Sequence, residues 1–296
     1  MLVDTVDAEH GDRVCRYIKE LGYSRIDTLL LTHPHDDHAG GAMAVLGQFE
    51  VGRILIPKAD YTTPEHQSAL SEAQRQGVEI IEVGYGYGFG LGTADVQFLS
   101  REGSYEDEND SSAVMKLSYG CRSFMFMGDC TKTAEADLVG SSADISADVI
   151  KVGHHGSDGS SSESFISAVQ AEYAVISCSA DNEYSHPSPY AVDRWIKSGA
   201  AVLCTDECSD IVFTTDGESL EVKAENEESV SARTDNGSSG QWSWILNTQN
   251  HTVHKPDCRY AKNINEENIS HSSADITRLL AEGYRKCKNC FIYQEN

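Results

Sequence analysis

One stretch of sequence decides the fold, Thr32-His33-Pro34-His35-Asp36-Asp37-His38-Ala39-Gly40-Gly41. It follows an apolar run at residues 29–31 and ends in two glycines, so we expect a polar loop between a buried strand and a helix. Imidazole nitrogens and carboxylate oxygens suit zinc, manganese or iron, and the His-x-His-x-Asp-His spacing can divide its ligands between two adjacent ions. A polar surface loop is the alternative, but packing gives no reason for three histidines beside two aspartates.

The length and charge of the chain limit the classes of protein that it can belong to. Its 296 residues are enough for one large domain, or a large domain and a small one. With 47 acidic and 23 basic side chains the formal net charge is -24, which disfavours a broad nucleic-acid-binding surface. No apolar run reaches the length of a membrane span, and the first residues do not resemble a signal peptide.

Three later strands are predicted to end in Asp or His residues. Residues 123–127 lead to Asp129, residues 148–152 lead to His154 and His155, and residues 173–177 lead towards His186. Adjacent histidines on a glycine- and serine-rich loop are poor core residues and good ligands. Loops that converge at strand ends are how a layered α/β scaffold builds a site.

Two features of the first half are interpreted as unrelated to this site. His66 lies in the first turn of a helix predicted from Pro64 to Gly77, and we expect it to be a surface histidine. The alternating glycines of residues 84–92 do not match a nucleotide-binding pattern, which predicts a flexible turn or an irregular sheet edge there.

The C-terminal end has the character of a separate small module. Residues 224–243 are poor in apolar side chains and predict a linker, and residues 244–296 become structured again. A module this short buries little core and needs an additional cross-link, such as a bound metal ion, to be stable. The spacing of His254-x-x-x-Cys258 and Cys287-x-x-Cys290 predicts one structural zinc, with His251 as the competing histidine. Basic residues near Cys290 leave open a modest DNA or partner contact.

With these residues assembled, residues 1–223 resemble the metallo-β-lactamase superfamily, an α/β (α+β) fold with four αββα layers. The more specific match is to the hydrolase domain of ComEC-type competence proteins, through residues 31–41, Lys151-Val152-Gly153-His154-His155-Gly156-Ser157 and His186-Pro187. The tail resembles the zinc-binding domain of Ada-type DNA-repair proteins, with His254 in place of a cysteine.

The resemblance implies a site with two divalent ions, zinc or manganese, bridged by Asp129. His33 and His35 would bind the first ion, and Asp37, His38 and one of His154 and His155 would bind the second. The other histidine of that pair and His186 would contact the substrate. Asp4 would not bind an ion itself but would orient a ligand histidine. The implied reaction is hydrolysis of a phosphodiester, with DNA as one candidate substrate. Asp37, a histidine or a metal-bound water is the candidate proton donor to the leaving oxygen.

The chain departs from the family pattern in three places. It begins almost at Asp4, without the family's opening strands, so a location in the cytoplasm or at the cell surface of a bacterium stays open. Val6 stands where the family has glycine, and no histidine supplies a third ligand to the first ion, which leaves Asn109, Asp110 or solvent on that side. Two other functions remain: hydrolysis of a small phosphoester such as phosphorylcholine, a lactone or a thioester, and a binding protein that acts through its zinc tail.

Overall fold

The computed structural model describes most of the chain. The described residues are 1–60, 62–101, 105–226, 244–255, 258, 261, 264–265, 268–272, 279–280 and 283–287. The chain divides into two compact units, Met1–Arg233 and Thr234–Asn296. Most of the predicted linker lies outside the described residues, so its boundaries stay predictions.

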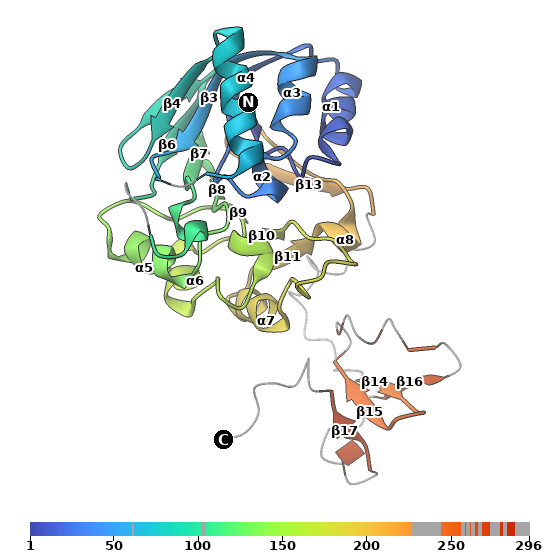
Figure 1. Cartoon of the computed structure of the whole chain (residues 1–296). Coiled ribbons are helices and arrows are strands. Elements are labelled where there is room, and N and C mark those ends of the chain that lie inside the picture. Colours follow the sequence, from blue (N-terminus) through green and yellow to red (C-terminus); the bar gives the residue numbers. More distant parts are fainter. Residues whose placement is uncertain are drawn as a thin grey trace. The chain divides into compact units, whose positions relative to one another are not determined.

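The large unit contains two main sheets (Figure 1). The first is parallel, in the order β1-β2-β3-β4: β1 (Leu2–Val3), β2 (Arg25–Leu30), β3 (Glu50–Pro57) and β4 (Glu79–Val83). The second runs in the order β11-β10-β9-β8-β7-β6-β5: β5 (Gly88–Leu91), β6 (Ala94–Phe98), β7 (Met115–Tyr119), β8 (Arg122–Phe126), β9 (Val149–Lys151), β10 (Tyr173–Ile176) and β11 (Ala201–Cys204). Its strands are antiparallel from β5 to β8 and parallel from β8 to β11.

Helices cover the outer face of each sheet. The first sheet is covered by α1 (Gly11–Glu20), α3 (Ala42–Gln48) and α4 (Pro64–Gln76); the second by α5 (Lys132–Gly140), α6 (Glu163–Val169) and α7 (Pro189–Lys197). Four shorter helices lie in connections: α2 (Asp36–Ala39), η1 (Glu108–Ser111), η2 (Gly153–Gly156) and α8 (Thr205–Cys208). The predicted four-layer αββα arrangement is confirmed.

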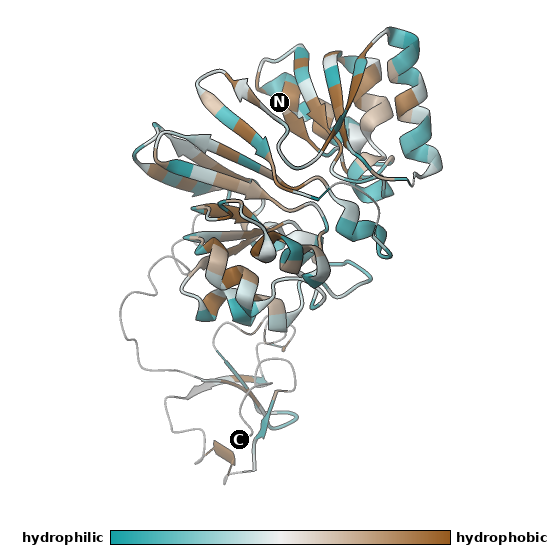
Figure 2. Ribbon diagram, turned by 90° about the vertical axis from the view of Figure 1, so that its left-hand side faces the viewer, coloured by the Kyte–Doolittle hydropathy of each residue, from teal (hydrophilic) through white to brown (hydrophobic). Residues whose placement is uncertain are grey.

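The alternation of side chains along β2 and just beyond it shows why the layers form. Leu29 and Leu31 pack among the helices on one face, whereas Leu30 packs between the sheets with Phe98 and Met115. Successive side chains of a strand point to opposite faces, so an apolar run is what a strand buried on both faces requires. Figure 2 shows the hydrophobic residues concentrated in the strands.

One prediction about the first half is refined and another is wrong. Of the two alternatives for residues 84–92, the sheet edge is found, but it is regular: residues 88–91 form β5, which pairs with β6 at the edge of the second sheet, and the alternate glycines leave Phe89 and Leu91 as the side chains that pack inwards. His66 is buried rather than exposed. Thr63 caps α4, and its hydroxyl also donates a hydrogen bond to the Pro34 carbonyl at 2.7 Å. This bond holds the first turn of α4 against the loop of residues 32–41, which we call the ligand loop.

Two smaller sheets complete the described structure. The hairpin of β12 (Ile211–Thr215) and β13 (Leu220–Ala224) closes the large unit. The tail has a sheet in the order β16-β14-β15-β17: β14 (Trp244–Asn247), β15 (Thr252–His254), β16 (Ile269–Ser272) and β17 (Arg285–Lys286). Within the described part of the chain, every helix is too short or too polar to cross a membrane.

We expect Gly41→Ala to destabilise the large unit. An added Cβ would overlap the Thr5 carbonyl oxygen and approach the Gly11 Cα to 2.9 Å, and both are backbone atoms. Overpacking of this kind lowers the free energy of unfolding by about 1–3 kcal/mol. Gly47→Ala is the matched control, because its Cβ meets no atom within 4 Å and α3 should gain about 0.5–1 kcal/mol. Urea unfolding followed by circular dichroism measures both, and equal stabilities of the two variants would contradict this packing.

Candidate metal centre

The ligand loop begins where β2 ends and is fixed to the end of β1 by one carboxylate. Asp4 accepts hydrogen bonds from the Thr32 backbone N–H at 2.7 Å and from the Thr32 hydroxyl at 2.8 Å. Its second oxygen also lies 2.7 Å from Nδ1 of His38. Asp4 therefore contacts both the start of the loop and a histidine in α2.

His33 and His35 form the first part of the site. Nε2 of His33 lies 3.1 Å from Nδ1 of His35, and 4.0 Å from Oδ2 of Asp129. Burial lowers the pKa of His33 to about 3, so its imidazole is neutral near pH 7. A neutral imidazole has a lone pair to offer a metal ion.

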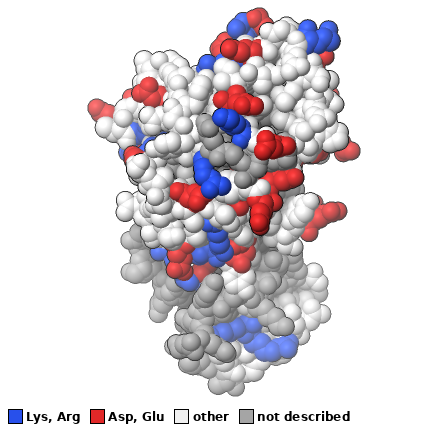
Figure 3. Space-filling model, turned by 60° about the vertical axis from the view of Figure 1, so that its left-hand side comes forward, with Lys and Arg blue, Asp and Glu red and all other residues white. Residues whose placement is uncertain are grey.

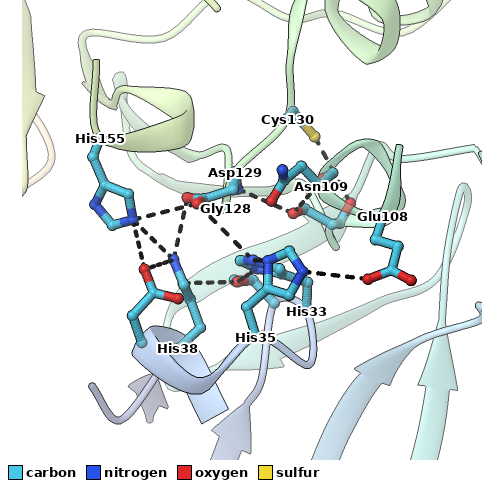
Figure 4. Close-up of polar contacts among 12 residues, drawn as sticks. His33, His35, His38, Glu108, Asn109, Gly128, Asp129, Cys130 and His155 are labelled. Carbon is cyan, nitrogen blue, oxygen red and sulfur yellow. Dashed lines mark hydrogen bonds and ion pairs between the residues drawn. The ribbon is translucent and has the colours of Figure 1, made fainter. Parts of the chain in front are cut away.

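A second group of ligand atoms lies on the other side of Asp129. Asp37, His38, Asp129 and His155 each contribute one atom to a cluster whose members lie within 4.8 Å of one another. Nε2 of His38 is 3.2 Å from Oδ1 of Asp129, and Nε2 of His155 is 3.3 Å from Oδ2 of Asp129 and 3.1 Å from Oδ2 of Asp37. Figure 4 shows His38, Asp129 and His155 converging from different elements.

The two histidines of this cluster direct the same nitrogen at each other. Nε2 of His38 and Nε2 of His155 are 3.2 Å apart. Nδ1 of His38 faces Asp4, and Nδ1 of His155 lies 2.8 Å from the Ser177 carbonyl oxygen, to which it donates. A histidine that donates through Nδ1 keeps its Nε2 as an acceptor unless it carries a second proton. The centre is thus rich in acceptors and requires a cation.

Protons meet this requirement when no metal ion is bound. Burial opposes protonation of His38, but Asp4 and Asp129 outweigh it and raise the pKa of His38 to about 10. Burial likewise opposes protonation of His155, and Asp129 and Asp37 raise its pKa to about 9. Burial opposes ionisation of Asp129, yet His155 and His38 hold the pKa of Asp129 well below its usual range.

The structure distinguishes the two adjacent histidines that the sequence left as alternatives. His154 and His155 both have positive φ, 49° and 50°. Non-glycine residues in this conformation are concentrated at functional sites. This backbone directs only His155 to Asp37 and Asp129. His154 turns to His186 instead, with ring centroids 5.5 Å apart, and its Nδ1 is buried without a hydrogen-bond partner.

Two further residues lie near the centre, one that the sequence analysis did not assign to the site and one that it named only among alternatives. Lys151, at the end of β9, places Nζ 3.9 Å from Oδ1 of Asp129. Asn109 in η1 has a buried Oδ1 without a hydrogen-bond partner. The sequence named Asn109 only as one possible neighbour of the first ion, because nothing in its immediate context distinguishes a ligand from a turn residue. His66 also has a buried Nε2 without a hydrogen-bond partner, but it is not in the cluster.

Comparison with known proteins agrees with this geometry. Residues 1–180 match the model of the metallo-beta-lactamase superfamily. The chain is 34% identical over 198 residues to ComE operon protein 3 of Bacillus subtilis, which covers 67% of this chain and 26% of the relative. It is 32% identical over 187 residues to competence protein ComA of Neisseria gonorrhoeae, covering 62% and 25%. The chain thus spans about a quarter of the length of these two relatives.

Solved structures also resemble the chain. One is the metallo-beta-lactamase fold protein YhfI from Bacillus subtilis, with a TM-score of 0.40 and 12% identity over 69% of this chain and 72% of that one. The family match extends over the first sheet, the ligand loop, Asp129 and both histidines of η2. The chain belongs to the metallo-beta-lactamase superfamily of metal-dependent hydrolases.

Proposed function

We propose that the large unit hydrolyses phosphodiesters with two divalent ions bound on either side of Asp129. The observation that carries the proposal is the pair of facing Nε2 atoms of His38 and His155, 3.2 Å apart and in contact with Asp129. Such a group of acceptors needs either protons on its histidines or a metal ion at its centre, and a metal ion can replace the protons. Asp37, His38 and His155 would hold one ion, with Asp129 shared between the two.

The other ion would be held by His33, His35 and Asn109. Nε2 of His33 and Nδ1 of His35 face the same space. Two residues close to Asn109 in the sequence contact the site. Glu108 lies against His35, with 3.4 Å between Oε2 and Nε2, and the Ser112 hydroxyl accepts a hydrogen bond from the Asp129 backbone N–H at 3.0 Å. These contacts place Asn109 between them, next to the site. Figure 4 draws Asn109 beside these residues. An unpaired buried amide oxygen is costly unless a ligand satisfies it, so Asn109 Oδ1 fits the place of the family's third histidine.

The side chains around the ions have distinct tasks in this reaction. Two adjacent divalent ions lower the pKa of a shared water and stabilise the attacking and leaving oxygens of a displacement at phosphorus. Asp37 has a pKa lowered to about 2, because His155 and His38 outweigh the opposing effect of burial. It therefore serves as a ligand rather than as the proton donor considered from the sequence. His154 and His186 lie together at the rim, where they would contact the phosphate.

The name of one relative, competence protein ComA, supports a substrate related to DNA. The surface charge supports the alternative, a small phosphoester. Figure 3 shows acidic side chains spread over the face of the large unit that it presents, and the formal net charge is -24. Long-range repulsion of this sign slows the approach of a polyanion. The same repulsion slows the approach of a small ester far less, because a small ester carries few charges.

The tail is proposed to hold one structural zinc. His254, Cys258 and Cys287 are all buried and form a cluster of possible ligands, with Nδ1 of His254 3.2 Å from the Cys258 sulfur. Cys290, the fourth predicted ligand, lies outside the described residues. Two or three thiolates and an imidazole are the donors of closed structural zinc sites.

Asp129→Asn and His155→Ala should abolish hydrolysis of bis-p-nitrophenyl phosphate in the presence of manganese. Each removes a group that touches the proposed ions. Loss of even an outer partner of a metal ligand typically costs about 10–100-fold in activity, so we expect more than about 100-fold here. Steady-state rates at saturating manganese provide the measurement.

Asp95→Asn is the matched control, because Asp95 is exposed on β6 and should leave the rate unchanged. Retained activity in both site variants would refute the hydrolytic role of the centre. Loss of activity in all three variants would show that the assay reports general damage. Single-stranded DNA and p-nitrophenyl phosphorylcholine, assayed side by side, separate the two substrate classes.

Manganese binding should release protons near neutral pH. His38 and His155, with pKa values raised to about 10 and about 9, are protonated there in the metal-free chain. An ion that takes their Nε2 atoms must displace those protons, so its affinity falls as the pH falls. Manganese avoids the thiol sites, which prefer softer ions.

Isothermal titration calorimetry in two buffers with different ionisation enthalpies measures this release. The apparent binding enthalpy should differ between the buffers, and the difference should shrink in His155→Ala. The same enthalpy in both buffers for the unaltered chain would contradict the assigned ligands.

A further inference from the structure

A second group of metal-ligand side chains lies in the large unit, away from the hydrolytic centre. Cys178 follows β10, Cys204 ends β11, and Asp206 lies in α8. One ligand atom from each lies within 4.8 Å of the other two, and the sulfur of Cys178 is 3.3 Å from Oδ1 of Asp206. Cys204 is buried, whereas Cys178 and Asp206 are half-buried.

The backbone holds these three residues in a defined frame. Thr205 Oγ1 accepts a hydrogen bond from the Cys178 N–H at 2.9 Å and donates one to the Cys178 carbonyl at 2.8 Å. In the parallel pairing of β10 and β11, Ile176 lies opposite Cys204. Cys204 is the last residue of β11 and Cys178 lies two residues beyond the end of β10, so the pairing of the two strands brings their backbones close together.

The chemistry of the group suits a soft divalent ion. The hydrogen bond between the Cys204 and Cys178 side chains lowers the pKa of Cys178, although burial and the Asp206 carboxylate oppose this effect. Two sulfurs that share a tetrahedral zinc at roughly 2.3 Å each lie about 3.8 Å apart. The 4.8 Å limit on the whole group is compatible with this spacing.

We propose that Cys178, Cys204 and Asp206 bind a zinc-class ion, with water as its fourth ligand. The alternative is that Cys178 and Cys204 form a disulfide with each other. The geometry favours the ion, because an ion uses all three ligand atoms of the group, whereas a disulfide uses only the two sulfurs and gives Asp206 no role.

An ion at this site would help to hold a ligand of the hydrolytic centre, His155, in position. Ser177, which directly precedes Cys178, is the residue whose carbonyl accepts the Nδ1 hydrogen bond of His155. An ion bound to Cys178 would fix the segment that carries this carbonyl. Asp206 and Cys204 would thus act as positioning residues for His155 through a site that does not touch substrate.

Cobalt(II) titration of the full-length chain tests the proposal. The three tail cysteines, Cys258, Cys287 and Cys290, are first replaced by serine, so that thiolate-to-cobalt charge transfer reports only on the large unit. We expect this near-ultraviolet band in that background. Cys178→Ser should abolish it and Asp206→Asn should weaken it, whereas Cys15→Ser should retain it, because Cys15 is buried in the helical layer over the first sheet.

Alkylation of Cys178, followed by mass spectrometry, provides a second measurement. Zinc should slow the reaction at Cys178 at least about tenfold, as expected for a sulfur that becomes a metal ligand. A missing cobalt band, a band that survives Cys178→Ser, or a Cys178–Cys204 disulfide in metal-treated protein would overturn the proposal. None of these outcomes depends on hydrolysis, so the proposed function is tested separately.

Discussion

The large unit depends on one constraint, the need to neutralise a buried carboxylate at the end of β8. Asp129 is almost fully buried and lies between two groups of histidines. An isolated buried carboxylate is strongly disfavoured. The surrounding imidazoles, Lys151 and the cations that they attract make its burial tolerable.

The layered fold brings the required groups to one edge of the sheets. Asp4 comes from the end of β1, His33 to His38 from the loop after β2, Asp129 from the end of β8 and His155 from the end of β9. These segments are far apart in the sequence. The left-handed backbone at His154 and His155 adds local strain that the surrounding contacts must offset. Rigid strands thus position ligands that flexible loops alone could not.

The sequence predicts the composition of the site better than its geometry. The density of ligands after residue 31 and the strand-end positions of Asp129 and His155 are visible without coordinates. The choice between His154 and His155 is not, because adjacent residues share the same pattern and only the backbone torsions separate them. His66 was misjudged because helix position does not reveal the contact of α4 with the ligand loop. The place of Asn109 depends on contacts of Glu108 and Ser112 across more than a dozen residues of sequence.

The central claim is that two ions lie on either side of Asp129. A crystal structure of the manganese-loaded protein, with anomalous diffraction measured at the manganese edge, tests it most directly. The account predicts two peaks: one bonded to His33 Nε2, His35 Nδ1 and Asn109 Oδ1, the other to Asp37, His38 and His155. A single peak, or peaks that leave Asp129 unbound, would contradict it.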